Sequence, residues 1–215
     1  MTNEEYNKKL HIINEDLETL RKEYLHISRV IIGENLLEED LFFCASTDKG
    51  IRILDGFRMM IKERNLTCVG ALVRMQIDNC MRTYAPFIAE NRKEVLDTII
   101  YQNKELKHCR TNKGDKMTDF TLVRELSAFD EAIKEVYKQS SGYVHLSEKA
   151  FYTIARTEEP SLITLNIGGV LDDRCNDAIN EGISAFLYFT KLHQKILKAV
   201  AESKTRFDEK YKDEV

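Results

Sequence analysis

Residues 137–151, YKQSSGYVHLSEKAF, bring serine and tyrosine hydroxyls close to a histidine within one short run. Because an imidazole titrates near neutrality, His145 could act as a general base or acid. A histidine at the C-terminus of a helix also interacts favourably with the last free carbonyls and with the helix dipole. The residue types alone leave the catalytic and the structural role open. Candidates for ligand binding in the same stretch are Lys138, Ser141, Tyr143 and Ser147.

A second candidate group repeats at a spacing of four residues. Arg74, Asp78 and Arg82 therefore share one stripe of an otherwise apolar helix. Because burying unpaired charge is costly, this stripe must face water, a partner or an internal pocket. One interpretation is a surface row of ion pairs. The other is an anion-binding wall, in which Asp78 orients two guanidinium groups toward a bound phosphate.

Residues 104–117 form the most loop-like part of the chain and carry five lysines and arginines against two acidic residues. A basic loop of this kind can position phosphate groups without reading a nucleic-acid sequence, and Arg110 is its candidate ligand-binding residue. A solvated loop without a ligand is the alternative interpretation.

Composition restricts the function classes. The chain has 215 residues, and 32 lysines and arginines against 36 aspartates and glutamates give a net charge of −4, which argues against a surface coated in positive charge for DNA binding. No apolar run reaches the length of a membrane span and the N-terminus lacks a signal-peptide core, so we expect a cytoplasmic protein without membrane contact. The five cysteines form no C-x-x-C pair, and no metal or nucleotide motif occurs. We therefore expect reduced thiols, no metal and no cofactor.

The first 33 residues show apolar side chains at alternating spacings of four and three, which predicts one long helix that stops at Gly33. The seam has two interpretations. It packs on the rest of a helical bundle, or it forms a coiled-coil arm that makes the protein a homodimer. The seam residues are Tyr6, Leu10, Ile13, Leu17, Leu20, Tyr24, Ile27 and Ile31.

The remaining pattern predicts an all-α helical bundle that forms a single domain over residues 1–215. Its helical core covers residues 45–149, with a helix from about Ser46 to Arg64, a boundary at Pro86 and one helix over residues 120–139. β-Branched and aromatic residues predict a small β-hairpin over about 150–168. A long final helix, capped by Asp172 or Asp173, is expected over 172–205, followed by a frayed charged tail.

Two stretches also resemble a known group. ALVRMQIDNCMRTY and MTDFTLVRELSAFDEAIKEVYKQSSGYVHLS are similar to segments of a group of bacterial helical proteins, which resembles in turn the HEPN superfamily of helical bundles. Many members of that superfamily are RNases of toxin–antitoxin and antiphage defence systems, with an arginine shortly before a catalytic histidine at a dimer interface. His145 matches the histidine. No arginine occupies the matching position, and the nearest upstream one is Arg124.

The resemblance implies an RNA-directed component of a bacterial defence or toxin system. As a metal-independent endoribonuclease, the protein would use His145 to deprotonate a ribose 2′-hydroxyl, and Arg74, Arg82 or the basic loop to stabilise phosphate charge. The alternative is a non-catalytic module that binds a nucleotide or a partner protein, and the missing arginine favours it. The sequence leaves both open, together with the hypothesis that His145, Tyr143 and Ser147 share a polar pocket with one of the two arginines.

Overall fold

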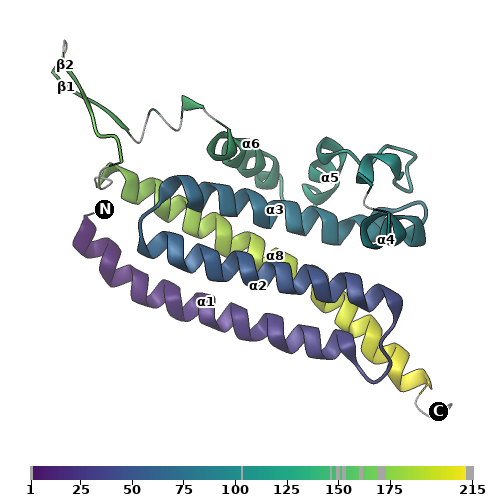
Figure 1. Cartoon of the computed structure of the whole chain (residues 1–215). Helices are drawn as coiled ribbons and strands as arrows, with labels where there is room; N and C mark the ends of the chain where they lie inside the picture. The colour runs from purple at the N-terminus through teal and green to yellow at the C-terminus, as the bar shows by residue number, and fades with distance from the viewer. Residues whose placement is uncertain are drawn as a thin grey trace.

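The computed structural model describes residues 2–102, 104–145, 147–148, 151, 154–159, 162–168 and 173–211, and it confirms the predicted all-α class. Four long helices run side by side: α1 (Asn3–Ile32), α2 (Glu38–Lys62), α3 (Leu66–Ile88) and α8 (Arg174–Tyr211). Figure 1 shows them as one layered bundle with the C-terminal helix returning along the other three. The described helices include none that is both long and apolar enough to cross a membrane.

The N-terminal seam is buried inside this bundle. Leu17, Tyr24 and Ile31 are fully buried, and α1 packs against α2 and α8. The helix begins with a Thr2–Glu5 capping box and ends at Gly33, whose φ of 55° suits glycine. Packing on the bundle is therefore the interpretation that the structure bears out, since a coiled-coil arm would need the same apolar face.

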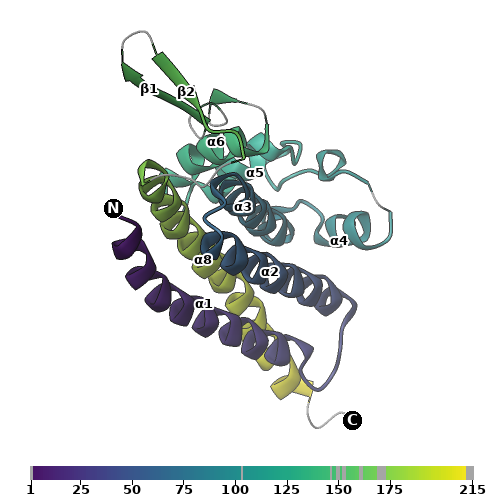
Figure 2. The same ribbon diagram turned by 60° about the vertical axis from the view of Figure 1, so that its left-hand side comes forward.

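Shorter elements cover the outside of α3. They are α4 (Arg92–Ile100), the 3₁₀ turn η1 (Leu106–His108), α5 (Asp119–Leu126) and α6 (Ala132–Val144), and Figure 2 shows them on the side of α3 that faces away from α1. Strands β1 (Ala155–Glu159) and β2 (Leu162–Leu165) pair antiparallel, within the range for which a hairpin was expected. The ribbon of these strands projects from the bundle next to the start of α8.

Several predicted boundaries were wrong for identifiable reasons. The helix expected from Ser46 begins at Glu38, where Asp40 accepts a hydrogen bond from the backbone N–H of Leu37 (2.7 Å) and caps the helix. Helix α3 continues through Pro86 to Ile88, since a proline near a helix end removes only one hydrogen bond.

The predicted helix over 120–139 is in fact two helices, α5 and α6. The side chain of Asp130 accepts a hydrogen bond from the N–H of Ala132 (2.9 Å), which starts α6 in a new direction. The final helix runs on to Tyr211, so the tail expected to fray is helical as far as that residue. Asp172 lies outside the described residues. Asp173 bonds to Asn176 through its backbone carbonyl (3.1 Å) and its side chain (3.4 Å) at the start of α8.

Candidate functional site

The two stretches singled out in the sequence meet in space at Arg74 and Tyr137. The Nη2 atom of Arg74, on α3, donates a hydrogen bond of 2.6 Å to the hydroxyl of Tyr137, on α6. The guanidinium carbon also lies 3.9 Å from the centroid of the Tyr137 ring, a cation–π distance. Arg74 is therefore held against Tyr137 by both the ring and the hydroxyl.

Ion pairs extend this contact along α3. The Nε of Arg82 lies 3.0 and 3.1 Å from the two carboxylate oxygens of Asp78, as the four-residue spacing predicts. Asp119, at the start of α5, approaches Arg82 at 3.4 Å and Arg74 at 3.9 Å. Lys49 of α2 lies 3.6 Å from Asp78. We call this group the arginine cluster: Lys49, Arg74, Asp78, Arg82, Asp119 and Tyr137.

Arg74 is the most buried cation of the cluster, with only 17% of its side chain exposed. Within the described part of the chain it donates one hydrogen bond, to Tyr137, although a guanidinium carries five N–H groups. Burial raises the pKa of Tyr137, an effect that the positive charge of Arg74 partly opposes. The phenol is therefore protonated at neutral pH, so it accepts from Arg74 and keeps its own O–H as a donor.

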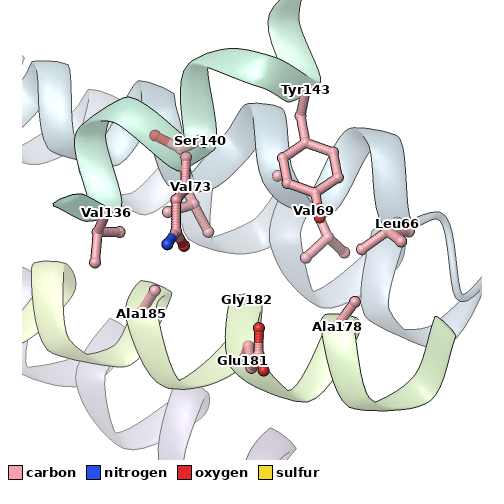
Figure 3. Close-up of a pocket in the computed structure, with 12 residues that line it drawn as sticks. Leu66, Val69, Val73, Val136, Ser140, Tyr143, Ala178, Glu181, Gly182 and Ala185 are labelled. Carbon is pink, nitrogen blue, oxygen red and sulfur yellow. The ribbon is translucent and has the colours of Figure 1, made fainter. Parts of the chain in front are cut away.

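A pocket lies between α6 and α8, with α3 as its third wall (Figure 3). Its volume is about 280 Å³, and most of its walls are apolar or small. Tyr143 points from α6 toward α3, and its ring lies directly on Gly70. The lining residues are Leu66, Val69, Gly70, Val73, Val136, Gln139, Ser140, Tyr143, Ala178, Glu181, Gly182 and Ala185.

The structure does not bring His145 to the arginine cluster. His145 follows the last residue of α6, its side chain is exposed, and its backbone N–H donates to the carbonyl of Ser141 (3.4 Å). It stands eight residues beyond Tyr137, which corresponds to about 12 Å along the helix. The hydroxyl of Ser147 donates to the carbonyl of Gly142 (2.6 Å). His145 and Ser147 thus close a helix, and among the described residues no hydrogen bond or ion pair joins His145 to Arg74 or Arg82.

The other sequence candidates make no side-chain contact with the charged groups of the cluster among the described residues. The hydroxyl of Ser141 donates to the carbonyl of Tyr137 (2.9 Å), and Lys138 is exposed. Arg110 donates to the carbonyl of Gly114 (2.7 Å) within the predicted basic loop. That loop is partly ordered by η1 and by a short bridge between Arg110 and Lys116.

The sequence analysis did not predict a buried polar centre around His193. His193 of α8 is fully buried, with its Nδ1 2.7 Å from the hydroxyl of Tyr24 and its Nε2 2.9 Å from Ser46 and 3.0 Å from Thr83. Burial lowers the pKa of His193 to about 3, so the ring is neutral. A serine beside a histidine suggests nucleophilic catalysis. Among the described residues, however, no carboxylate bonds to this ring, and the imidazole is fully buried in the bundle. Ser46, Thr83 and His193 occupy helix positions that face the core, and this pattern could have indicated a buried polar centre from the sequence.

Comparisons with known proteins identify no relative. No protein-family model, curated protein or solved structure matches the chain. Within the described residues, no group of three or more histidine, cysteine, aspartate or glutamate side chains is arranged to hold a metal ion. The arginine cluster and the neighbouring pocket are therefore the features on which a function can be argued.

Proposed function

We propose that this protein is a non-catalytic binding module that holds a phosphate-bearing ligand, a nucleotide or an RNA strand, at the arginine cluster. The observation that carries the proposal is the state of Arg74, which is mostly buried and yet makes one hydrogen bond with the described residues. A planar guanidinium fork binds phosphate oxygens in pairs, and partial burial strengthens such contacts.

The charges around Arg74 support an anion. The cluster holds three cations and two carboxylates, and Arg82 and Lys49 are each more than a third exposed. Asp119 is half exposed and lies 3.9 Å from Arg74, so this ion pair is long and open to exchange. A phosphate that displaces Asp119 would bind Arg74 and Arg82 together. An RNA strand is the ligand that the resemblance to the HEPN superfamily favours.

Cleavage of RNA by the same chain has less support. A general base must lie within hydrogen-bond reach of the proton that it removes. His145 follows the C-terminal end of α6, eight residues after Tyr137, which contacts Arg74. The geometry within one chain therefore favours binding over catalysis.

The test compares binding of labelled single-stranded RNA and of ATP by wild type, Arg74→Lys and Arg74→Gln at low salt. Arg74→Lys keeps the charge but loses the fork, so we expect a loss of affinity of about tenfold, equivalent to about 1.4 kcal/mol. Arg52→Gln, an exposed arginine paired with Asp48, is the matched control. The ligand that the wild-type protein binds more tightly, RNA or ATP, shows whether the bound phosphate belongs to a nucleic acid or to a free nucleotide.

Three results would overturn the proposal. The first is an equal effect of the Arg74 and Arg52 substitutions on binding. The second is that neither ligand binds. The third is metal-independent cleavage of RNA by the purified protein that His145→Ala abolishes, which would make the chain a ribonuclease.

A further inference from the structure

Exposed aromatic rings gather where α3, α8 and the turn between α5 and α6 meet. Phe87 of α3 is 39% exposed and Phe129 of the turn is 48% exposed. Tyr84 lies between them, with its ring centroid 6.1 Å from that of Phe87 and 5.3 Å from that of Phe129. Large apolar side chains that cluster at a surface commonly mark an interaction site.

These rings surround a hollow of about 150 Å³, whose other walls come from Leu192, Lys195, Ile196 and Ala199 on α8. Pockets for drug-sized ligands are at least twice this volume. The hollow therefore has room for a single large apolar side chain, the typical anchor of a protein–protein contact.

The hollow continues along α8 as a groove. Phe87 and Ala199 also line a second hollow, which extends past Ser203 to Phe207. From Leu192 to Phe207 the helix rises about 22 Å, the length of a four-turn helix laid beside it. The groove starts seven residues after Ala185, about 10 Å along α8 from the pocket beneath α6, and it is a separate surface.

The charged side chain of the groove that forms no ion pair with the described residues is a lysine. Lys195 places its Nζ 5.9 Å from the centroid of the Phe129 ring and pairs with no carboxylate of the described chain. The two carboxylates in the groove are occupied, because Arg92 lies 3.1 Å from Glu39 and Lys204 lies 2.6 Å from Asp40. An acidic partner would therefore meet a complementary surface.

We propose that this groove, the aromatic groove lined by Tyr84, Phe87, Phe129, Lys195 and Ile196, binds an acidic amphipathic helix of a partner protein. The partner inserts one large apolar side chain between Phe87 and Phe129. A carboxylate one turn away on the partner pairs with Lys195. The small hollow fits one large apolar side chain, the length of the groove fits a helix of about four turns, and Lys195 favours an acidic face.

The test uses three labelled helical peptides of about 16 residues. One has an acidic polar face and a central phenylalanine, the second has the same phenylalanine with a basic face, and the third has the acidic face with serine as the anchor. We expect the first to bind, and the other two to bind at least tenfold more weakly. Phe129→Ala and Lys195→Glu should each weaken the first peptide at least tenfold. Lys22→Glu, an exposed lysine on α1, should not.

The outcomes separate the possible occupants. If no peptide binds, or if the acidic and basic peptides bind equally, the proposal is wrong. If the protein alone self-associates in sedimentation and Phe129→Ala abolishes this, the occupant is a second copy and the partner helix is wrong. Because Phe129 is half exposed, its truncation should leave thermal unfolding nearly unchanged, which distinguishes lost binding from lost folding.

Discussion

Tyr143 lies directly on the backbone of Gly70. A Cβ atom built on Gly70 would overlap the Tyr143 ring at Cγ, so only a glycine at this position allows α6 to approach α3 this closely. The contact anchors the C-terminal end of α6, while Tyr137 on Arg74 anchors its middle. One helix is thus held on α3 at two points, Tyr143 beside the pocket and Tyr137 in the arginine cluster.

Gly70→Ala should destabilise the protein by about 1–3 kcal/mol, the usual cost of overpacking, even though alanine is the better helix former. The ring of Tyr143 must move, and the pocket between α6 and α8 changes with it. Urea denaturation measures the loss. The double variant Gly70→Ala, Tyr143→Ala should show non-additivity, because removing the ring removes the two closest contacts and leaves only the Cβ of residue 143, 2.7 Å from the new Cβ.

Gly56→Ala is the matched control on α2. The atoms nearest to a Cβ at Gly56 are 3.9 Å away on Leu72, an ordinary van der Waals distance. This substitution should therefore stabilise the protein by up to about 1 kcal/mol, through helix propensity alone. Equal stabilisation by the Gly56 and Gly70 substitutions would show that Tyr143 does not rest on α3.

Tyr137→Phe tests how Arg74 is held. The change removes the hydroxyl that accepts from Arg74 and keeps the ring beneath the guanidinium. Loss of a hydrogen bond to a charged donor should cost about 1.5–3 kcal/mol of stability, less what water at the edge of the cluster restores. Tyr137→Leu removes the cation–π contact as well and should cost a further ~0.5–1 kcal/mol. If both variants unfold as the wild type does, the contact does not stabilise the fold.

The spacing of apolar residues predicted the long helices well, because the buried face of a helix appears directly in the sequence as apolar residues three or four positions apart. The seam from Tyr6 to Ile31 and the stop at Gly33 are examples. The break after α5 was missed, since apolar spacing continues from Leu126 to Ile133 and only Asp130 marks the new helix start. An apolar stripe at helical spacing thus predicts that a helix is present, whereas capping side chains such as Asp130 decide where one helix stops and the next begins.

The site was harder to predict, because it depends on which helices become neighbours. The spacing of Arg74, Asp78 and Arg82 predicted a shared stripe and an Arg82–Asp78 pair. No local signal indicated that Tyr137 would be the partner of Arg74. Likewise, His193 meets Tyr24 across 169 residues of sequence, and only the folded bundle brings them together.

Lys204→Met should be among the most destabilising single substitutions. Lys204 lies 2.6 Å from Asp40, and both side chains are almost completely buried. Removing the lysine leaves an unpaired buried carboxylate, a change that typically costs 3–5 kcal/mol. Lys8→Met, which breaks an exposed pair with Glu4, should change stability by less than about 0.5 kcal/mol. Guanidinium denaturation distinguishes them, and similar small effects would show that the Lys204 pair is hydrated.

His193 should make stability depend on pH in a specific window. Its pKa is about 3 in the folded protein because burial disfavours the charged ring, against about 6.5 in an unfolded chain. Between these values the unfolded state binds a proton that the folded state does not. The contribution is therefore fully present above pH 6.5 and falls by about 1.4 kcal/mol per pH unit on acidification toward pH 3.

The measurement compares the free energy of unfolding of wild type and His193→Gln from pH 7 to pH 4. Carboxylates contribute to both proteins, so the difference in slope reports His193. We expect the variant to be less stable at pH 7 and its slope to be shallower by about 1.4 kcal/mol per pH unit. His26→Gln, on an exposed position of α1, should keep the wild-type slope. Should the variant not fold, NMR of the wild-type imidazole decides. Gln76 donates to the Tyr24 hydroxyl (3.0 Å), and that hydroxyl lies 2.7 Å from Nδ1. We expect the hydroxyl to donate to Nδ1 and the ring to stay neutral, with its proton on Nε2, down to pH 4. A ring that titrates near pH 6 would contradict its burial.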